Sequence, residues 1–394
     1  MFQASAYEYS SLAPVDLAQT VERLRRDRPL GGIVALVAEA DAESVAALQE
    51  ICRRNAIPLA GGVFPALIRD GGFVRSGALL LAHDVMPPTL LIEDANANAA
   101  STAERLADFA RGNETAYPLE SDPPVLFMVF DSTLPDICRI LHETGDRLDG
   151  DFTYAGANAG SETFRPVPCL FDEKRFVQGG ALVQLLPPKG ALCAEHGFDT
   201  PLRVMTATRT DNNRILTIND QPAFQIYQDI LKADYGVDMT ADSFYGAAVH
   251  YPFGILNAKA QMTVRIPVAV DGDGVITCVG EVPEGAMLAL LQTPRAKDAS
   301  CVTRLAAHMA KAGASHHAAE LLGFYCAGRL MQMGPEQAAQ ELADLTARTH
   351  AKALVGALSL GEISTDRNFQ PAFHNAVILC GEVFGGSAAN EGDR

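Results

Sequence analysis

Residues 33–38 read IVALVA, a continuous apolar run that is rich in β-branched residues. Such a run is typical of a strand that is buried on both faces in a parallel sheet. The residues after it predict a helix with Val45 and Leu48 on its buried face, and Asp41 is the expected N-cap. A short strand over 57–60 follows, and residues 73–81 predict a hairpin arm and another strand. The segment therefore predicts a strand–helix–strand–hairpin unit of an α/β fold.

The same order of elements recurs later in the chain. Residues 125–130 predict another buried strand, and a helix with one apolar face follows over 134–141. Residues 152–156 repeat the short strand that ends in Ala-Gly, and residues 176–182 (FVQGGAL) resemble residues 73–79 (FVRSGAL). Similarity of this kind indicates a duplicated supersecondary unit.

The length of the chain predicts two domains, because 394 residues exceed the roughly 250–300 residues at which single cores stop growing. Proline, glycine and histidine interrupt the apolar pattern over 187–201, which places the boundary there. We expect one domain over 1–200, a second over 201–384 and a disordered polar tail over 385–394. The predicted fold class is α/β, with two domains of repeated strand–helix–strand–hairpin units that form mixed sheets covered by helices.

The composition excludes several classes of partner. The net charge is −17, and a surface that negative repels phosphate backbones, so we expect neither nucleic acid nor an anionic membrane as a partner. No apolar stretch has the length of a bilayer-spanning helix. The eight cysteines are scattered without a C-x-x-C pair. Together with the lack of a signal peptide, this pattern predicts a reducing, cytoplasmic location.

The motifs of common enzymes are missing from the sequence. It contains no P-loop, no G-x-S-x-G elbow and no H-E-x-x-H helix, which makes an enzyme the least expected class. Glycines instead mark the ends of two predicted strands: Gly61 and Gly62, close to Phe64, correspond to Gly156 in the second repeat. Glycine lets a backbone approach a ligand at a strand end, but it also makes tight turns, and both interpretations stay open.

One histidine has mostly apolar neighbours in the sequence. His250 belongs to a largely apolar run over 244–255 and is followed by Tyr251 and Pro252. A neutral imidazole in apolar surroundings can ligate haem iron, which makes this segment a candidate cofactor and metal site. The alternative is a hydrogen-bonded histidine with a purely structural role.

Three segments in the last part of the chain carry a family resemblance. Residues 324–329 read FYCAGR, residues 356–363 read GALSLGEI, and residues 373–375 are Phe-His-Asn before an apolar strand. In this order they resemble the C-terminal module of the FIST sensory family, and the duplicated unit resembles its N-terminal module. The segment GGVFP over 61–65 departs from the usual family pattern after the first glycine. This variant is similar to the haem-binding, nitric-oxide-responsive FIST proteins called NosP.

The resemblance implies a cytoplasmic sensor that binds a small molecule and acts in a two-component system. The expected partner is a histidine kinase, or else a diguanylate cyclase or phosphodiesterase. The resemblance also allows a homodimer. In the NosP branch the cofactor is haem b, nitric oxide binds its iron, and His250 is the first choice of axial ligand. A second hypothesis is a FIST module for an amino acid or other small organic ligand. Arg329 and Glu362 would then supply polar contacts, with Arg329 pairing a ligand carboxylate, unless the two side chains form an internal ion pair. An enzyme of unknown class is the third.

Overall fold

The structure is a computed structural model that describes residues 4–26, 29–95, 97–117, 123–187, 192–199, 203–256, 262–294, 300–312 and 320–382. The predicted tail over 385–394 and part of the predicted boundary over 187–201 lie outside these residues.

The body of the molecule contains three copies of one repeat, in which two strand–helix steps lead to a third strand, a hairpin and a last strand. The first copy comprises β1 (Ala4–Ser10), α1 (Pro14–Arg26), β2 (Gly32–Ala38), α2 (Val45–Arg54), β3 (Leu59–Phe64), β4 (Ala66–Arg69), β5 (Gly72–Val74) and β6 (Ala78–His83). The second comprises β7 (Thr89–Ile92), α3 (Ala99–Gly112), β8 (Val125–Asp131), α4 (Ile137–Leu148), β9 (Thr153–Ala159), β10 (Leu170–Asp172), β11 (Phe176–Val177) and β12 (Ala181–Leu186). These two copies confirm the predicted repeats.

The third copy is formed by the end of the chain and was not predicted as a repeat. It comprises β13 (Cys193–Glu195), α7 (Ser300–Lys311), β22 (Glu320–Cys326), α8 (Ala327–Met333), α9 (Pro335–Arg348), β23 (Ala353–Ser359), β24 (Glu362–Thr365), β25 (Pro371–His374) and β26 (Ile378–Glu382). An insert over 203–294 separates β13 from α7, which hides the periodicity in the sequence.

Each copy completes the sheet of another copy. The three sheets have the strand orders β1-β6-β2-β3-β10-β11, β7-β12-β8-β9-β24-β25 and β13-β26-β22-β23-β4-β5. In each sheet the first four strands come from one copy and the last two are the hairpin of a different copy. The three copies are therefore linked in a closed ring. The sheets do not follow the expected division at residue 200, because strands of the last part of the chain pair with strands of the first part.

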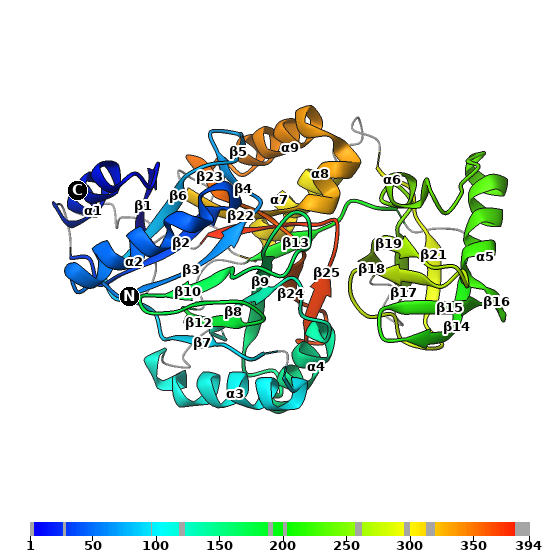
Figure 1. Cartoon of the computed structure of the whole chain (residues 1–394), viewed down its shortest axis with the longest axis horizontal. Coiled ribbons are helices and arrows are strands. Elements are labelled where there is room, and N and C mark those ends of the chain that lie inside the picture. The colour runs from blue at the N-terminus through cyan, green and yellow to red at the C-terminus, as the bar shows by residue number, and fades with distance from the viewer. Residues whose placement is uncertain are drawn as a thin grey trace.

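The ring has an apolar centre. Phe64 from β3, Phe127 from β8 and Phe324 from β22 are buried and meet there, with ring centroids 5.8 Å apart between Phe64 and Phe324 and 5.9 Å apart between Phe127 and Phe324. The helices cover the outer faces of the sheets (Figure 1). In α1, the apolar side chains of Leu17 and Val21 are buried. Burial of this kind at about 25 cal/mol per Å² of apolar surface is the main term that stabilises the body.

The insert is a separate lobe beside the body (Figure 1). Its antiparallel sheet has the order β18-β17-β21-β14-β15-β20-β19, with β16 beside β15, and α5 packs on it. Its elements are β14 (Met205–Asp211), β15 (Arg214–Ile218), β16 (Gln221–Pro222), α5 (Ala223–Ile230), α6 (Phe244–Ala248), β17 (Phe253–Leu256), β18 (Met262–Arg265), β19 (Pro267–Val270), β20 (Ile276–Cys278) and β21 (Met287–Leu290). The predicted α/β class with mixed sheets covered by helices is confirmed for the chain as a whole.

The expected N-cap at Asp41 is wrong. Asp41 lies in a 3₁₀ turn over Glu39–Ser44, and its Oδ2 accepts the backbone N–H of Gly77 at 2.6 Å. In the second copy, Oδ2 of Asp131 accepts the N–H of Gly179 at 2.7 Å. Both carboxylates therefore hold the left-handed glycine that begins the last strand of their copy, a long-range contact that local sequence pattern does not reveal.

Candidate functional site

An open cavity of about 550 Å³ lies at the third copy of the repeat. Its walls are β13 and the residues after it, the C-terminal end of α7, β24 with the loop after it, and the end of β25. Met262 of the insert also contributes to the lining. Nine of its sixteen lining residues are polar or charged: Glu195, His196, His308, Lys311, Ser364, Thr365, Asp366, Arg367 and His374. We call this cavity the β13 pocket.

Glu195 is fixed at the end of β13. Its Oε1 accepts the backbone N–H groups of His196 and Gly197 at 3.1 and 3.2 Å. The same oxygen lies 3.2 Å from Nε of Arg304, and Oε2 lies 3.7 Å from Nδ1 of His308, both on α7. The carboxylate of Glu195 therefore joins β13 to α7 and is already neutralised by a neighbouring cation.

His196 presents a neutral imidazole. Its Nδ1 accepts the backbone N–H of Phe198 at 2.9 Å, so the neutral ring carries its proton on Nε2. Burial lowers the pKa of His196, the charges of Arg304 and Arg329 act in the same direction, and Glu195 opposes them. Nε2 is therefore a hydrogen-bond donor at neutral pH.

His374 lines the pocket from the end of β25. Its Nε2 lies 3.0 Å from Oγ of Ser364 on the adjacent strand β24. Burial lowers the pKa of His374, and the charge of Arg265 lowers it further. The imidazoles of His196 and His374, which both line the pocket, are therefore uncharged at neutral pH.

The charged groups of the pocket lie nearer to its rim. Lys311 ends α7 and Arg367 follows β24, and both side chains are exposed. Oδ1 of Asp366 accepts the N–H groups of Asn368 and Gln370 at 2.7 and 2.9 Å, so this carboxylate stabilises the turn to which it belongs. Burial raises the pKa of the lining thiol Cys193 to about 11, so it stays protonated and is a poor nucleophile. The arrangement is suited to holding a polar ligand by hydrogen bonds and charge.

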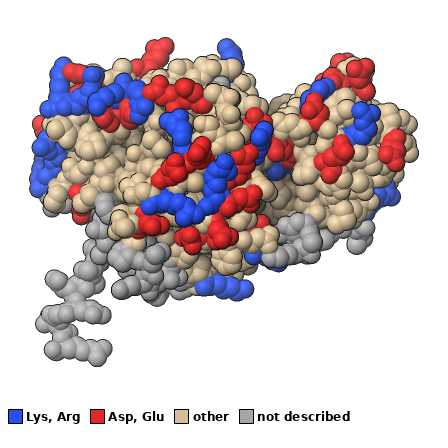
Figure 2. Space-filling view, turned by 90° about the horizontal axis from the view of Figure 1, so that it is seen from below, with Lys and Arg blue, Asp and Glu red and all other residues tan. Residues whose placement is uncertain are grey.

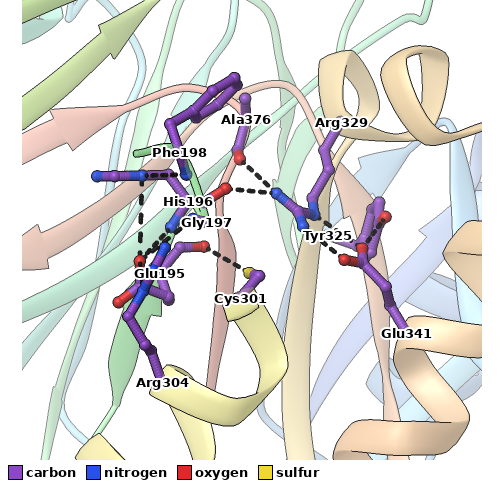
Figure 3. A network of polar contacts seen from close by, with 10 residues as sticks. All are labelled: Glu195, His196, Gly197, Phe198, Cys301, Arg304, Tyr325, Arg329, Glu341 and Ala376. Carbon is purple, nitrogen blue, oxygen red and sulfur yellow. Dashed lines mark hydrogen bonds and ion pairs between the residues drawn. The ribbon is translucent and has the colours of Figure 1, made fainter. Parts of the chain in front are cut away.

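Arg329 is buried and does not line the pocket. Figure 3 shows its side chain with its contacts to Glu341, His196 and Ala376. The predicted ion pair between Arg329 and Glu362 is wrong, because Arg329 pairs with Glu341 of α9 through Nε at 2.8 Å and Nη2 at 2.5 Å. Nη1 donates to the carbonyl oxygens of His196 at 2.6 Å and Ala376 at 3.3 Å. The guanidinium is therefore buried and engaged by protein groups, and it does not face a ligand carboxylate in the pocket.

Glu362 does not line the pocket either. It lies opposite His374 in the β24–β25 register and is fully buried. Burial raises the pKa of Glu362 to about 8, although the hydroxyl of Ser359, which donates to Oε1 at 2.5 Å, opposes this shift. At neutral pH the side chain is mostly a protonated carboxylic acid.

The histidine predicted as a haem ligand lies in the insert. His250, Tyr251 and Pro252 form the turn between α6 and β17, where their carbonyl oxygens accept hydrogen bonds from Thr293, Tyr227 and Leu291, respectively. The ring of His250 is half-buried, and its Nδ1 lies 3.4 Å from Oγ1 of Thr293. None of these three residues lines the β13 pocket.

The predicted glycines have a structural explanation. A Cβ atom at Gly61 would overlap the carbonyl oxygen of Ala35, and one at Gly156 would overlap that of Met128, each on the neighbouring parallel strand. Gly62 lies opposite Leu170 of the incoming hairpin, and Phe64 belongs to the apolar centre. These four residues keep the strands of the ring together and do not line the β13 pocket.

Sequence reasoning missed most of the pocket. Glu195 and His196 lie in the stretch that was interpreted as an interdomain connection, and His308 and Lys311 lie beyond the insert. His374 was noticed only as part of the Phe-His-Asn segment. That segment was the one signal that pointed to the pocket.

Within the described ranges, no three His, Cys, Asp or Glu side chains are grouped so that they could hold a metal ion. None of the helices that the structure describes is both long and apolar enough to cross a membrane. On the face shown in Figure 2, acidic and basic side chains are interspersed over the described residues.

Comparison with known proteins identifies the family. The FIST N domain model matches residues 32–221, and the FIST C domain model matches residues 223–365. A comparison with curated proteins gives no match. Among solved structures, a crystal structure of chorismatase is similar at 10% sequence identity and a TM-score of 0.33, over 96% of this chain and 99% of that chain. Since the two domain models cover most of the chain in the order N then C, the chain belongs to the FIST family, whose domains are small-ligand sensor modules.

Proposed function

We propose that this FIST protein senses a small polar organic ligand, and that the ligand binds in the β13 pocket. The observation that carries the proposal is the pair of neutral imidazoles, His196 after β13 and His374 at the end of β25, which line one cavity. Neutral rings can donate to or accept from a ligand without adding charge. The proposed role is binding and signalling and not catalysis.

The chemistry of the pocket favours a ligand with a carboxylate, such as an amino acid or a small dicarboxylic acid. Glu195 is neutralised by Arg304, and Asp366 is held by its own turn, whereas Lys311 makes no ion pair with the described residues. The rim therefore offers positive charge to an anionic group, and the imidazoles offer hydrogen bonds to the rest of the molecule.

The β13 pocket does not fit haem. Porphyrin faces are apolar and are usually held between apolar side chains, whereas most of the side chains that line this pocket are polar or charged. Haem binding with His250 as the axial ligand, and sensing of nitric oxide through it, therefore remain a separate hypothesis. Three other expectations also remain predictions: the partner (a histidine kinase, or a diguanylate cyclase or phosphodiesterase), the homodimer and the cytoplasmic location.

A thermal-shift screen tests the proposal. The purified protein is heated with each of the twenty protein amino acids and with small dicarboxylates, because a ligand of the native state raises the unfolding temperature. Lys311→Ala and His374→Gln should abolish the shift given by any active compound. His142→Ala is the matched control, since this histidine lies on α4 with its side chain 77% exposed. A shift that survives in both pocket variants would place the ligand elsewhere.

An absorption spectrum tests the haem hypothesis independently. Haem is added to the wild-type protein, to His250→Ala and to His142→Ala, and the Soret band is recorded with and without nitric oxide. Stoichiometric binding that is lost only in His250→Ala would support haem at that residue. Weak binding that is equal in all three proteins would refute it.

A further inference from the structure

Arg329 is a deeply buried charged side chain next to the β13 pocket, with 1% of its surface exposed. It comes from α8, and its partner Glu341 comes from α9. The hydroxyl of Tyr325 on β22 donates to Oε2 of Glu341 at 2.6 Å and fixes this carboxylate from the other side. The position of the guanidinium is therefore set by three elements of the third copy (Figure 3).

The remaining donor of Arg329, Nη1, contacts backbone carbonyl groups in two different loop segments. Nη1 contacts the carbonyl oxygen of His196, in the segment after β13, and that of Ala376, in the segment between β25 and β26. His196 lines one wall of the pocket, and His374 and Val377, on either side of Ala376, line the other. One nitrogen thus joins the two walls.

We propose that Arg329 is a positioning residue of the β13 pocket, which holds the two walls together and so places the imidazoles of His196 and His374 across one cavity. The functional importance of the pocket rests on the proposed function. The role of Arg329 in placing the two rings does not depend on that function.

The geometry of the contacts requires arginine. Its planar fork meets both oxygens of Glu341 while Nη1 remains free for the two carbonyl groups. Lysine would keep the positive charge but has a single nitrogen at its end, which cannot reproduce this set of bonds.

The backbone at Ala376 shows why its segment needs support. Ala376 has φ of 57°, in the left-handed region that favours glycine. Gly179, which also has a positive φ, occupies the corresponding place in the second copy. Ala376 is held in this conformation by the bond from Arg329 and by its own N–H, which donates to Sγ of Cys326 at 3.1 Å. Loss of the bond from Arg329 should therefore let the wall that carries His374 relax.

Histidine titration by NMR tests the proposal without any ligand. The protein is labelled with ¹³C-histidine, and the nine histidine signals are followed between pH 5 and 8, with His196→Gln and His374→Gln used for assignment. The groups that act on His196 are Glu195, Arg304 and Arg329. Those that act on His374 are Arg265 and His196, together with Ser364 as its hydrogen-bond partner. Arg329 does not act on His374 through its charge.

The two possible roles of Arg329 predict different spectra. If Arg329 positions the walls, Arg329→Lys and Glu341→Gln both expose the ring of His374, whose signal then titrates within this range although it does not in the wild-type protein. If Arg329 contributes only its charge, Arg329→Lys leaves both histidines unchanged. An unchanged His374 in both variants would overturn the proposal.

Controls separate this result from unfolding. Glu341→Gln keeps the shape of the carboxylate and serves as the second variant if Arg329→Lys does not fold, which far-UV circular dichroism reveals. Arg175→Lys is the matched control, because Arg175 pairs with Asp172 and Glu93 away from the pocket. It should leave every histidine signal in place. Failure of the ligand screen would not affect this outcome, so the two proposals can fail separately.

Discussion

Glu362→Gln should remove a specific pH dependence of stability. Burial raises the pKa of Glu362 to about 8, from its ordinary value of 4.5. The folded protein therefore keeps this carboxyl protonated at pH values where the unfolded chain has already ionised it. Stability from this group is complete below the unfolded value and is lost progressively as the pH rises towards the folded value.

The effect of Glu362 on stability is best measured between pH 6.5 and 8. His196 and His374 have lowered pKa values, so their effect on stability fades as the pH rises through the ordinary histidine value of 6.5, and both proteins contain them. The difference between wild type and Glu362→Gln over this range therefore reports on Glu362. Over about 1.5 pH units, at about 1.4 kcal/mol per unit, the wild-type protein should lose about 2 kcal/mol that the variant keeps. Glutamine is neutral and has nearly the shape of the protonated acid, so it can still accept the hydroxyl of Ser359.

Urea unfolding followed by circular dichroism at pH 6.5 and 8 measures the effect. The difference in unfolding free energy between wild type and Glu362→Gln should change by about 2 kcal/mol between the two pH values. The contribution of the buried cysteines to the pH dependence cancels in this difference, because both proteins contain them. Glu22→Gln on the exposed face of α1 is the control and should follow the wild type. If Glu362→Gln also follows the wild type, the carboxyl of Glu362 is ionised in the folded protein and the reasoning is wrong.

Three further substitutions or labelling experiments test the fold. Gly156→Ala should lower the unfolding free energy by at least about 3 kcal/mol, because its Cβ would overlap a strand backbone, whereas Gly72→Ala, with nothing within 4 Å of its Cβ, should be nearly neutral in the same urea titration. Asp131→Ala should cost about 1–3 kcal/mol, since the N–H of Gly179 loses its acceptor, and equal unfolding midpoints would contradict this. Iodoacetamide at pH 8 should label the half-buried Cys138 and Cys193 before the other six cysteines, which are buried, as mass spectrometry of peptides would show.

The fold was largely predictable from local sequence patterns. The run IVALVA and its counterpart over 125–130 form the buried strands β2 and β8, and the stripe of apolar residues in 14–26 forms α1. The two strands expected to end at glycines lie close to the expected places, but they run on past Gly61, Gly62 and Gly156 to Phe64 and Ala159, so the glycines do not mark strand ends. These features follow from periodicity and burial, which act over a few residues.

The ring and the pocket were not predictable in this way. Hairpin exchange between copies depends on pairs such as Glu362 with Ala157, which lie far apart in sequence. The third copy was hidden because the insert separates β13 from α7. The pocket combines the ends of β13, α7 and β25, and the partner of Arg329 is Glu341 and not Glu362 because α8 and α9 pack side by side. Contacts of this range leave no periodic signal in a single sequence.

The central claim is that the ligand of this FIST protein binds between His196 and His374. The ¹³C-histidine spectrum in the presence of a saturating amino acid or dicarboxylate identified in the thermal screen tests it most directly. We predict that the signals of His196, His308 and His374 move while those of His250 and His142 stay in place. A spectrum in which His250 moves and the three pocket histidines do not would contradict the account.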